Sequence, residues 1–511
     1  MRPGTIDTMA IPGISKSRFT DYLECPKLGY MSCHRDRFKH LADPLDWMAL
    51  HLIGEGNRVG QLARERFPGG RLIGHVFDLA KARAETTEAM RDDTLEYLFE
   101  GAFASDGLLC RVDVLHKVDD GVVDLIEVKA TNAVKPEHLP DIGFQLAVLE
   151  RTGLVVRSAR LMHFDPQYVH PGGDRYDFDA LFAIDDVTDR ARAWVRENRD
   201  PLLLAMQADL AQAEPPKVPI RYGCRDCVYY RRACAPSAPE HPVFELGYDR
   251  GGLFGALDAA GIEDLRDVPD DFPGLADGHW LVLEAVRSRE LALDCRGFES
   301  LAAELDYPLW FLDFETYMPG LPIFAGMRPW QQIPFQWSLH VEERDGSARH
   351  AEFLKADGSD PRRDFAEALL AAVGHRGSIV VYNKGMESTR LRELARDLPD
   401  LAEGLLALDA RIVDLLPIVR RSCYHLDFHG SRSLKVITPV LAPHLSYEEL
   451  ALRGGMEAMQ AYELITDAST PEAEREQLRA DLLKYCSLDT LAMLEVLRRL
   501  RRLSTEKEGR G

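Results

Sequence analysis

The sequence predicts a mixed α/β protein with two α/β domains joined by a helical connector. A length of 511 residues is too great for one ordinary hydrophobic core. Strand-like and helix-like segments alternate in two separate stretches, the order typical of strand pairs flanked by helices. A proline-rich approach and short helical patterns separate the two stretches. We therefore expect domains at residues 14–236 and 306–505, with a connector at 237–305.

In the first domain, residues before Ile14 are expected to be irregular, and Ser15 or Ser17 to cap a short helix that carries Phe19 and Tyr22 on one face. Alternating apolar residues then predict a β-hairpin around the D-D-G turn that ends at Gly121. The other expected elements are helices at 44–67 and 141–153, a strand at 71–78, a helix followed by an extended segment over 79–103, and a strand at 155–165.

The second domain is expected to begin with a buried apolar strand that ends in acidic residues. Further strands and helices follow it in the pattern of an α/β layer structure. The expected strands are 307–317, 333–343, 348–356 and 378–383, and the expected helices are 364–374, 386–398, 411–421 and 476–500.

Composition and charge restrict the possible partners. Charged residues make up 28% of the chain and hydrophobic residues 46%, as in globular proteins. A net charge of −21 argues against broad, non-specific adhesion to nucleic acid, but a locally basic groove can exist on an acidic nuclease. No apolar run is long enough for a bilayer and no secretory signal is evident, so we expect a cytoplasmic protein without a membrane partner.

The nine cysteines are expected to be thiols and ligands rather than disulfides. Cys25 and the C-x2-C-x6-C series Cys224, Cys227 and Cys234 form a credible iron–sulfur ligand set. Four thiolates suit Zn2+ as well, and the spacing leaves both possibilities open. The remaining cysteines are interpreted as small apolar residues of the core: Cys33, Cys110, Cys295, Cys423 and Cys486.

A first candidate site lies on the predicted hairpin. Asp113 is on one strand, and Glu127 and Lys129 lie two apart on the other, so both face one side. Two carboxylates can hold a divalent cation, while a lysine orients water and stabilises charge on phosphate. Gln145, on the next helix, is expected to position water or the scissile strand. The alternative interpretation is a surface hairpin with an incidental salt bridge.

This arrangement resembles the RecB-like branch of the PD-(D/E)XK nucleases, specifically its iron–sulfur exonucleases, over residues 15–236. The resemblance implies a restriction-endonuclease-like fold in which Asp113 and Glu127 bind metal, Lys129 is catalytic and Gln145 assists. It also implies that Cys25, Cys224, Cys227 and Cys234 hold a 4Fe–4S cluster rather than zinc. The chain departs from the family at Gly60, where a metal-binding histidine is usual; His51 and Glu55 are nearby substitutes.

A second candidate site combines three blocks of the second domain. Asp313 and Glu315 end an apolar strand, Glu387 follows another buried strand, and Tyr485 and Asp489 lie one helical turn apart. Such a set can hold two cations about 4 Å apart, which clamp the attacking and leaving oxygens of an in-line displacement. Taken singly, the same blocks are equally typical of a strand end or a solvated helix face.

Together, the three blocks resemble the DnaQ-like (DEDD) 3′→5′ exonucleases, which have an RNase H-like fold, over residues 308–503. The resemblance implies that Asp313, Glu315, Glu387 and Asp489 bind metal and that Tyr485 orients the nucleophilic water. Glu387 stands where the family usually has aspartate. The pairing of both halves also resembles an uncharacterised bacterial family with two nuclease domains, in which Asp414, Ser433 and Lys435 match further blocks without an assigned role.

The sequence therefore predicts a nuclease dependent on Mg2+ or Mn2+, with two sites that hydrolyse phosphodiester bonds of nucleic acid. The resemblance favours single-stranded DNA as substrate and implies DNA repair or phage defence as the setting. The alternatives are a nucleic-acid-binding protein with one or both sites inactive, and an RNA-trimming exonuclease. Protein partners are left open.

Overall fold

The computed structural model describes residues 13–75, 78–173, 175–247 and 252–508. Residues 1–12, which the sequence predicts to be irregular, lie outside these ranges. The chain forms two compact units. The first contains residues 1–219, 228–233 and 319–331, and the second contains 220–227, 234–318 and 332–511. Each unit has a mixed sheet and helices, which confirms the predicted mixed α/β class.

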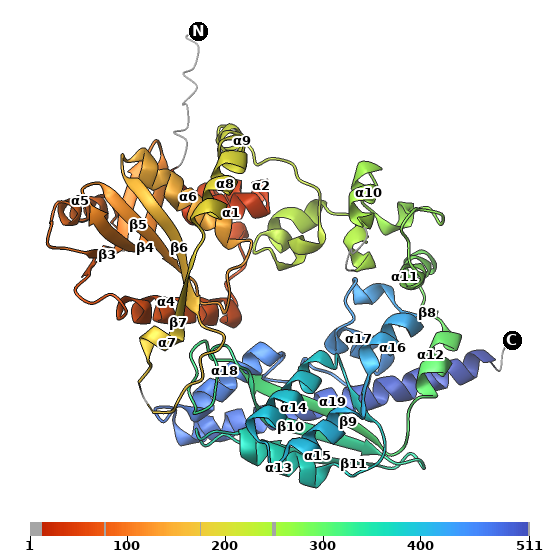
Figure 1. The fold of residues 1–511 in the computed structure, drawn as a ribbon. Helices are drawn as coiled ribbons and strands as arrows, with labels where there is room; N and C mark the ends of the chain where they lie inside the picture. The colour runs from red at the N-terminus through yellow and green to blue at the C-terminus, as the bar shows by residue number, and fades with distance from the viewer. Residues whose placement is uncertain (1–12, 76–77, 174, 248–251, 509–511) are drawn as a thin grey trace. The chain divides into compact units, whose positions relative to one another are not determined.

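A seven-stranded sheet forms the centre of the first unit, in the order β2-β3-β4-β5-β6-β7, with β1 beside β4. The pairs β3–β4, β4–β5 and β6–β7 are antiparallel, whereas β5 and β6 run parallel. Figure 1 shows β4, β5 and β6 side by side. The strands are β1 (Ile14–Ser15), β2 (Arg71–Leu72), β3 (Tyr97–Ser105), β4 (Leu108–Asp119), β5 (Val122–Val128), β6 (Val155–Phe164) and β7 (Phe182–Asp186).

The alternation of side chains along β4 and β5 separates an apolar face from a polar one. Val114 and Ile126 pack in one core cluster with Val59 of α4. Asp113 and Glu127 therefore point to the opposite face, which α6 covers. The helices are α1 (Lys16–Glu24), α2 (Pro26–Cys33), α3 (Arg35–Phe38), α4 (Trp47–Arg64), α5 (Leu79–Met90), α6 (His138–Arg151), α7 (Phe178–Leu181), α8 (Thr188–Trp194) and α9 (Asp200–Leu210).

Helix α1 begins at the first of the two predicted caps, because the Ser15 side chain accepts a hydrogen bond from Arg18 N. Phe19 and Tyr22 are buried, as predicted. The Phe19 ring stacks on Phe144 of α6, with 5.0 Å between centroids. This contact fixes the start of α1, and with it Lys16, against the polar face of the sheet.

A later part of the chain, residues 319–331, packs into the first unit. Gly320 N donates to Glu55 Oε2 at 2.8 Å, and Trp330 Nε1 donates to Ala130 O at 2.9 Å. Leu321 is fully buried in the cluster that contains Val59. The first unit is therefore completed by residues that follow the first strand of the second unit's main sheet.

The main sheet of the second unit has the order β11-β10-β9-β12-β13. Strands β11, β10 and β9 are antiparallel neighbours, while β12 and β13 run parallel to β9. A separate two-stranded sheet joins β8 and β14. The strands are β8 (Ala292–Leu293), β9 (Leu309–Tyr317), β10 (Ile333–Glu342), β11 (Ala348–Leu354), β12 (Ile379–Val381), β13 (Ile412–Asp414) and β14 (Cys423–Tyr424).

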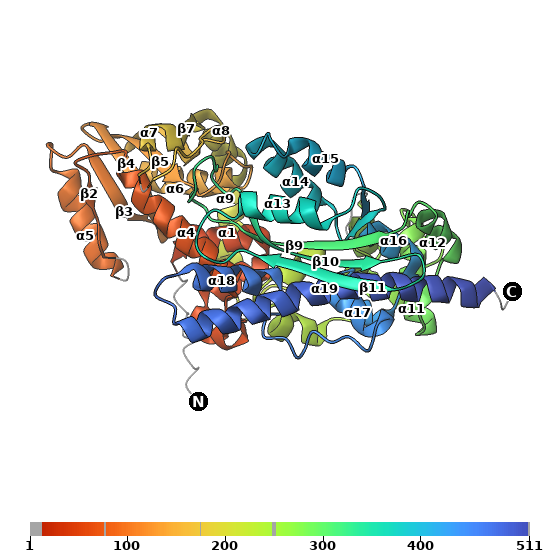
Figure 2. The ribbon, with the colours of Figure 1, turned by 90° about the horizontal axis from the view of Figure 1, so that it is seen from below.

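Helices cover both faces of this sheet, with α13, α14 and α15 on one side and α19 on the other (Figure 2). Trp310 and Leu312 of β9 pack on the first side, and Leu309 and Phe311 pack on the second. Since Asp313 follows the same alternation as Phe311, it faces α19. The helices are α10 (Leu253–Ala259), α11 (Asp277–Ser288), α12 (Cys295–Ala302), α13 (Arg362–Ala372), α14 (Gly385–Asp397), α15 (Ala402–Asp409), α16 (Leu415–Ser422), α17 (Leu434–Leu441), α18 (Gly455–Thr466) and α19 (Glu472–Glu508).

Three expectations need correction or refinement. The helix predicted over 411–421 is wrong at its start, because residues 412–414 pair with β12 as β13 and α16 begins at Leu415. Of the strand predicted over 71–78, the described residues form a strand only at Arg71–Leu72, which is β2; residues 76–77 lie outside the described ranges. The predicted connector contributes Leu257 and Val282 to the core that contains Phe311. No helix in the described part of the chain has the length and apolarity needed to cross a bilayer.

Candidate active sites

The four residues predicted for the first site lie together on the α6 side of the first sheet. Glu127 is almost fully buried, and its Oε1 accepts a hydrogen bond from Lys129 Nζ at 2.9 Å. Its Oε2 accepts from Gln145 Nε2 of α6 at 2.6 Å. Asp113 Oδ2 accepts from Val128 N at 2.7 Å, which holds this carboxylate beside the end of β5. Glu127 and Lys129 therefore lie on the same side of the chain, as their spacing of two residues predicted.

Two residues of this site were missed from the sequence. Lys16 Nζ donates to Glu127 Oε1 at 2.7 Å and lies 3.4 Å from Asp141 Oδ1. Asp141 also pairs with Lys129. Lys16 directly follows the Ser15 cap, a stretch that was interpreted only as a helix start. Asp141 lies one helical turn before Gln145 on α6. This spacing could have indicated from the sequence that the two side chains share one face of the helix.

The charges of the first site nearly neutralise one another. Burial alone would raise the pKa of Glu127, but Lys16 and Lys129 outweigh it and hold that pKa below its ordinary range. Burial, then the negative charge of Glu127, raises the pKa of Asp113 well above its ordinary value. The same two causes raise the pKa of Asp141. Glu127 is therefore ionised, and both of its oxygens are engaged by side chains of the protein.

The nearby substitutes for the family histidine have other contacts. Glu55 accepts the hydrogen bond from Gly320 N, and His51 stacks on Trp47 with 4.7 Å between centroids. A Cβ at Gly60 would meet no atom within 4 Å. Glu55 thus serves to anchor residues 319–331, and among the described residues neither Glu55 nor His51 forms a hydrogen bond or ion pair with the first site.

The cysteines form no disulfide in the described part of the chain. Cys25 lies between α1 and α2 in the first unit, whereas Cys224, Cys227 and Cys234 belong to the second. Cys224 Sγ accepts a hydrogen bond from Arg221 N at 3.3 Å. The four-cysteine ligand set stays a prediction. Of the cysteines interpreted as core residues, all but the half-buried Cys295 are buried: Cys33, Cys110, Cys423 and Cys486.

The second site gathers carboxylates from three elements of the second unit. Asp313 and Glu315 come from β9, Glu387 from the first turn of α14, and Asp489 from α19. One donor atom each from Asp313, Glu315 and Cys486 lie within 4.8 Å of one another. Glu387 is 2% exposed, and its Oε2 has no hydrogen-bond partner among the described residues. A buried carboxylate oxygen without a partner requires a proton or a cation.

Burial raises the pKa values of all four carboxyls, and repulsion by neighbouring acids adds to this effect at Asp313, Glu315 and Glu387. Burial, followed by the charge of Asp489, raises the pKa of Asp313 to about 8. Burial, followed by the charge of Asp313, raises the pKa of Glu315 and that of Glu387. Burial also raises the pKa of Asp489. The cluster therefore favours the uptake of positive charge.

Two further polar residues of the second site were not assigned a role from the sequence. Lys435 Nζ donates to Tyr485 OH at 2.6 Å and lies 4.7 Å from the centroid of that ring. Tyr447 OH donates to Asp489 Oδ1 at 2.6 Å. Burial, followed by the charges of Glu315 and Asp489, raises the pKa of Tyr485, which keeps its hydroxyl protonated. The resemblance noted in the sequence placed Lys435 in a block shared with a known family but gave it no role. No sequence pattern indicated that Tyr447 would reach the site.

Asp414 holds the turn that leads to Glu387. Its carboxylate accepts hydrogen bonds from Asn383 N at 2.9 Å and Lys384 N at 3.1 Å, and it also caps α16 through Leu416 N. Asn383 has φ +73°, a left-handed conformation that asparagine tolerates. Asp414 thus positions the first turn of α14 without belonging to the carboxylate cluster.

A cavity of about 920 Å³ opens beside the second site. Asp313 and Asp489 line it together with side chains that carry positive charge. Arg432 lies over the Tyr424 ring at 4.1 Å, and Arg225 lies over Tyr222 at 5.4 Å. The basic residues that line the cavity are Arg225, Arg420, Arg432 and Lys435. Carboxyls that favour positive charge next to guanidinium groups are an arrangement that suits a phosphodiester ligand.

Two other basic stretches of the chain have local partners. Arg231 and Arg232 both pair with Asp43, at 2.8 and 3.3 Å. Arg498 and Arg501 near the end of α19 pair with the buried Glu342 of β10. These pairs hold elements of each unit together.

Comparison with known proteins gives a match to a family model described as a domain of unknown function, DUF2779, over residues 310–433. These residues run from β9 to the loop that precedes α17. The chain is also 25% identical over 218 residues to the uncharacterized protein MG366 homolog of Mycoplasma pneumoniae. That match covers 39% of this chain and 33% of the relative, so the chain spans about a third of the relative's length. Neither description states an activity.

Proposed function

We propose that the protein is a metal-dependent nuclease and that the site of the second unit carries the hydrolysis of phosphodiester bonds. The observation that carries the proposal is a set of four carboxyls with raised pKa values, three of them buried and Asp313 half-buried, beside a basic cavity. Such a cluster favours cations, and the arginines offer bidentate contacts to phosphate. The side chains that would hold Mg2+ or Mn2+ are Asp313, Glu315, Glu387 and Asp489.

The residues of the chain divide the work of such a reaction. Bound divalent cations would supply an activated water and neutralise charge on the phosphate oxygens. Lys435 orients the Tyr485 hydroxyl, which stays protonated and can donate a hydrogen bond to a water or to a phosphate oxygen. Arg225, Arg420 and Arg432 would bind the backbone of the substrate.

The topology of the second unit supports the DnaQ-like interpretation. In chain order its five strands form the sequence 3-2-1-4-5, with the first three antiparallel and the last two parallel to the first. This is the arrangement expected of an RNase H-like fold, and α19 brings Asp489 to the acids of β9. A 3′→5′ exonuclease acting on single-stranded DNA is the activity that we propose for this unit.

The first unit is proposed to be a RecB-like PD-(D/E)XK domain, on the order β3-β4-β5-α6-β6 and on the Asp113, Glu127, Lys129 and Gln145 set. Gln145 Oε1 is buried without a hydrogen-bond partner among the described residues, so an acceptor is available for a water or metal-bound ligand. A 4Fe–4S cluster on the four predicted cysteines, with Zn2+ as the alternative, remains part of this proposal.

A second candidate function has a specific observation in its favour. Both oxygens of Glu127 are already engaged, Oε1 by two lysines and Oε2 by Gln145. A cation must displace at least one of these groups. We therefore propose, as the alternative, that the first unit binds nucleic acid while its own site cleaves slowly or not at all.

The experiment compares matched single-stranded DNA and RNA, labelled at either end, after anaerobic purification and addition of Mn2+. Wild type is compared with Asp313→Asn, Lys129→Ala and the surface control Asp345→Asn. Loss of all cleavage in Asp313→Asn alone would support a catalytic second unit and a binding first unit. Separate losses in both variants would support two nuclease sites. Intact DNA and RNA with every divalent metal would refute the proposal.

A further inference from the structure

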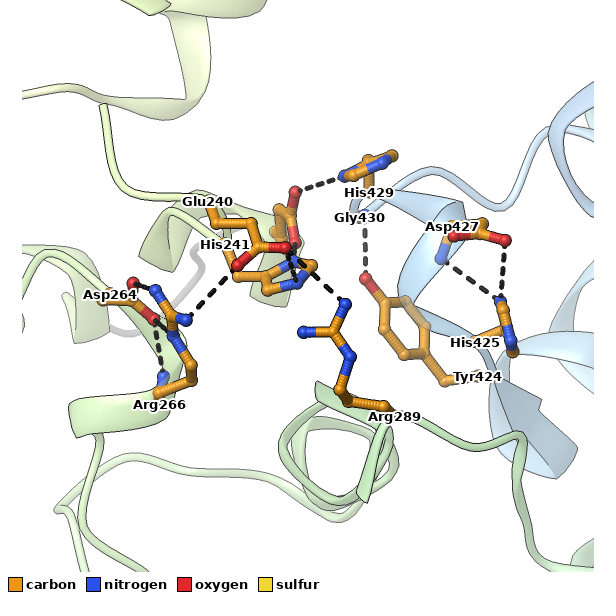
Figure 3. Close-up of polar contacts among 11 residues, drawn as sticks. Glu240, His241, Asp264, Arg266, Arg289, Tyr424, His425, Asp427, His429 and Gly430 are labelled. Carbon is orange, nitrogen blue, oxygen red and sulfur yellow. Dashed lines mark hydrogen bonds and ion pairs between the residues drawn. The ribbon is translucent and has the colours of Figure 1, made fainter. Parts of the chain in front are cut away.

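A third group of potential ligands lies in the second unit, apart from the carboxylate cluster. His241, Glu245 and His429 each offer one donor atom, and these atoms lie within 4.8 Å of one another. Glu245 lies in the short 3-10 helix Val243–Leu246, and His429 follows it by 184 residues. Both imidazoles contact the Glu245 carboxylate, and Figure 3 labels the two histidines.

The distances within this group are hydrogen-bond distances that are also close to the spacing of ligands around one ion. His241 Nδ1 lies 3.1 Å from Glu245 Oε2, and His429 Nδ1 lies 3.0 Å from Glu245 Oε1. Ligands at Zn–N and Zn–O distances of about 2.0–2.1 Å stand roughly 3.3 Å apart at the corners of a tetrahedron. Small rotations of the two rings would therefore bring all three donors to one ion.

The outer nitrogen of His241 also faces a carboxylate. Its Nε2 lies 4.0 Å from Glu240 Oε1, while Glu240 itself pairs with Arg266 and Arg289 (Figure 3). Histidines that bind metal commonly present their second nitrogen to a carboxylate, which fixes the ring and its tautomer. His241 and Glu245 are 2% and 3% exposed, so this part of the group is rigidly enclosed.

The backbone holds the third residue in an unusual conformation against the other two. His429 has φ +44°, in the left-handed region that non-glycine residues rarely adopt. A Cβ at the next residue, Gly430, would lie 2.6 Å from Glu245 Cα, so only glycine permits this close approach. Gly430 N is held by Tyr424 OH at 2.9 Å. The loop is thus built to present His429 to Glu245.

We propose that His241, Glu245 and His429 bind a zinc-like transition-metal ion that ties the loop 429–433 to the helix Val243–Leu246. Two imidazoles and one carboxylate suit Zn2+, whereas Mg2+ and Ca2+ prefer oxygen ligands alone. Three protein ligands leave a fourth position for water. Because Gly430, Arg432 and Lys435 line the basic cavity, the ion fixes one wall of that cavity. Metal binding at this position does not depend on the proposed nuclease activity.

The test measures bound zinc after dialysis against a weak chelator. His429→Asn removes the exposed imidazole and keeps a residue that tolerates the left-handed backbone. Glu245→Gln is a second variant of nearly the same shape, and His375→Gln is the control at an exposed histidine. We expect His429→Asn and Glu245→Gln to bind about one equivalent less zinc than wild type and the control.

Cobalt separates this ion from any metal on the cysteines. Co2+ at the proposed position gives visible bands of a tetrahedral nitrogen and oxygen site, without the near-ultraviolet thiolate band. We expect His429→Asn to lose the visible bands of the nitrogen and oxygen site and to keep any thiolate band that arises from cobalt on the cysteines. A chelator should lower the thermal midpoint of wild type more than that of His429→Asn. Equal zinc content and equal cobalt spectra in wild type, His429→Asn and Glu245→Gln would overturn the proposal.

Discussion

Each of the two units contains a cluster of acidic side chains, but the negative charge of the two clusters is balanced in different ways. In the first, Lys16 and Lys129 both contact Glu127, and the pKa of that carboxyl falls. In the second, Lys435 contacts Tyr485 rather than a carboxylate, and the pKa values of Asp313 and its neighbours rise. A lysine in direct contact replaces the cation that a buried carboxylate needs. The second cluster still needs a proton or a cation, so divalent metal should matter more for the second unit.

The largest expected difference between the two sites concerns catalysis. Asp313→Asn should lower Mn2+-dependent cleavage of single-stranded DNA by about 100-fold or more, because it removes the charge of a proposed metal ligand. Lys129→Ala should change total cleavage by less. Quantified product ladders from both labelled ends provide the measurement, with Asp345→Asn as control. A larger loss in Lys129→Ala would reverse the ranking of the two sites.

The next effect is on stability and concerns the first unit. Lys16→Met should destabilise the protein by about 1–3 kcal/mol, since it leaves buried Glu127 with one lysine instead of two. This loss is smaller than the usual cost of breaking a fully buried ion pair, because the Lys16 side chain is partly exposed to solvent. Urea unfolding gives the comparison, with the exposed Lys39→Met as matched control. If the two variants unfold at the same urea concentration, the ion pair between Lys16 and Glu127 does not contribute to the stability of the protein.

A smaller effect separates positioning from metal binding in the second unit. Tyr485→Phe keeps the ring beneath Lys435 and removes the hydroxyl, so kcat should fall about tenfold with little change in KM. The affinity for Mn2+, measured by calorimetry, should be unchanged. A parallel loss of Mn2+ affinity would show that the hydroxyl acts through the metal ligands instead.

The smallest effect is a dependence of stability on pH. Asp313 has an ordinary pKa of 3.8 and a folded pKa of about 8, so the folded state binds more protons and stability falls as pH rises between these values. In the presence of a chelator, Asp313→Asn should therefore unfold a few degrees above wild type near pH 8, with the difference shrinking toward pH 4. Differential scanning calorimetry at several pH values tests this. A pH-independent difference would rule out Asp313 as its source.

The sequence predicted the features that depend on local pattern. The alternation along β4 and β5 placed Glu127 and Lys129 on one face, and the capping chemistry of Ser15 placed the start of α1. Contacts between distant residues were missed. Lys16 reaches Glu127 across 111 residues, and Lys435 reaches Tyr485 across 50. Nothing in the spacing of such residues indicates that the fold brings them together.

Pairing between strands also overrode local preference. Residues 412–414 continue a helical pattern in sequence, yet they extend because β12 offers a parallel partner from Ile379 to Val381. That choice aims Asp414 at the turn before α14 and so fixes Glu387. The propensity of a short segment is weaker than the hydrogen bonds that a neighbouring strand supplies.

Residues 319–331 make the first unit dependent on a part of the gene that encodes the second. A fragment ending at residue 236 would lose Leu321 from its core and the hydrogen bonds of Gly320 and Trp330. No single cut in the chain yields two complete halves. A single crossover in the gene would therefore separate one unit from residues that belong to its own core.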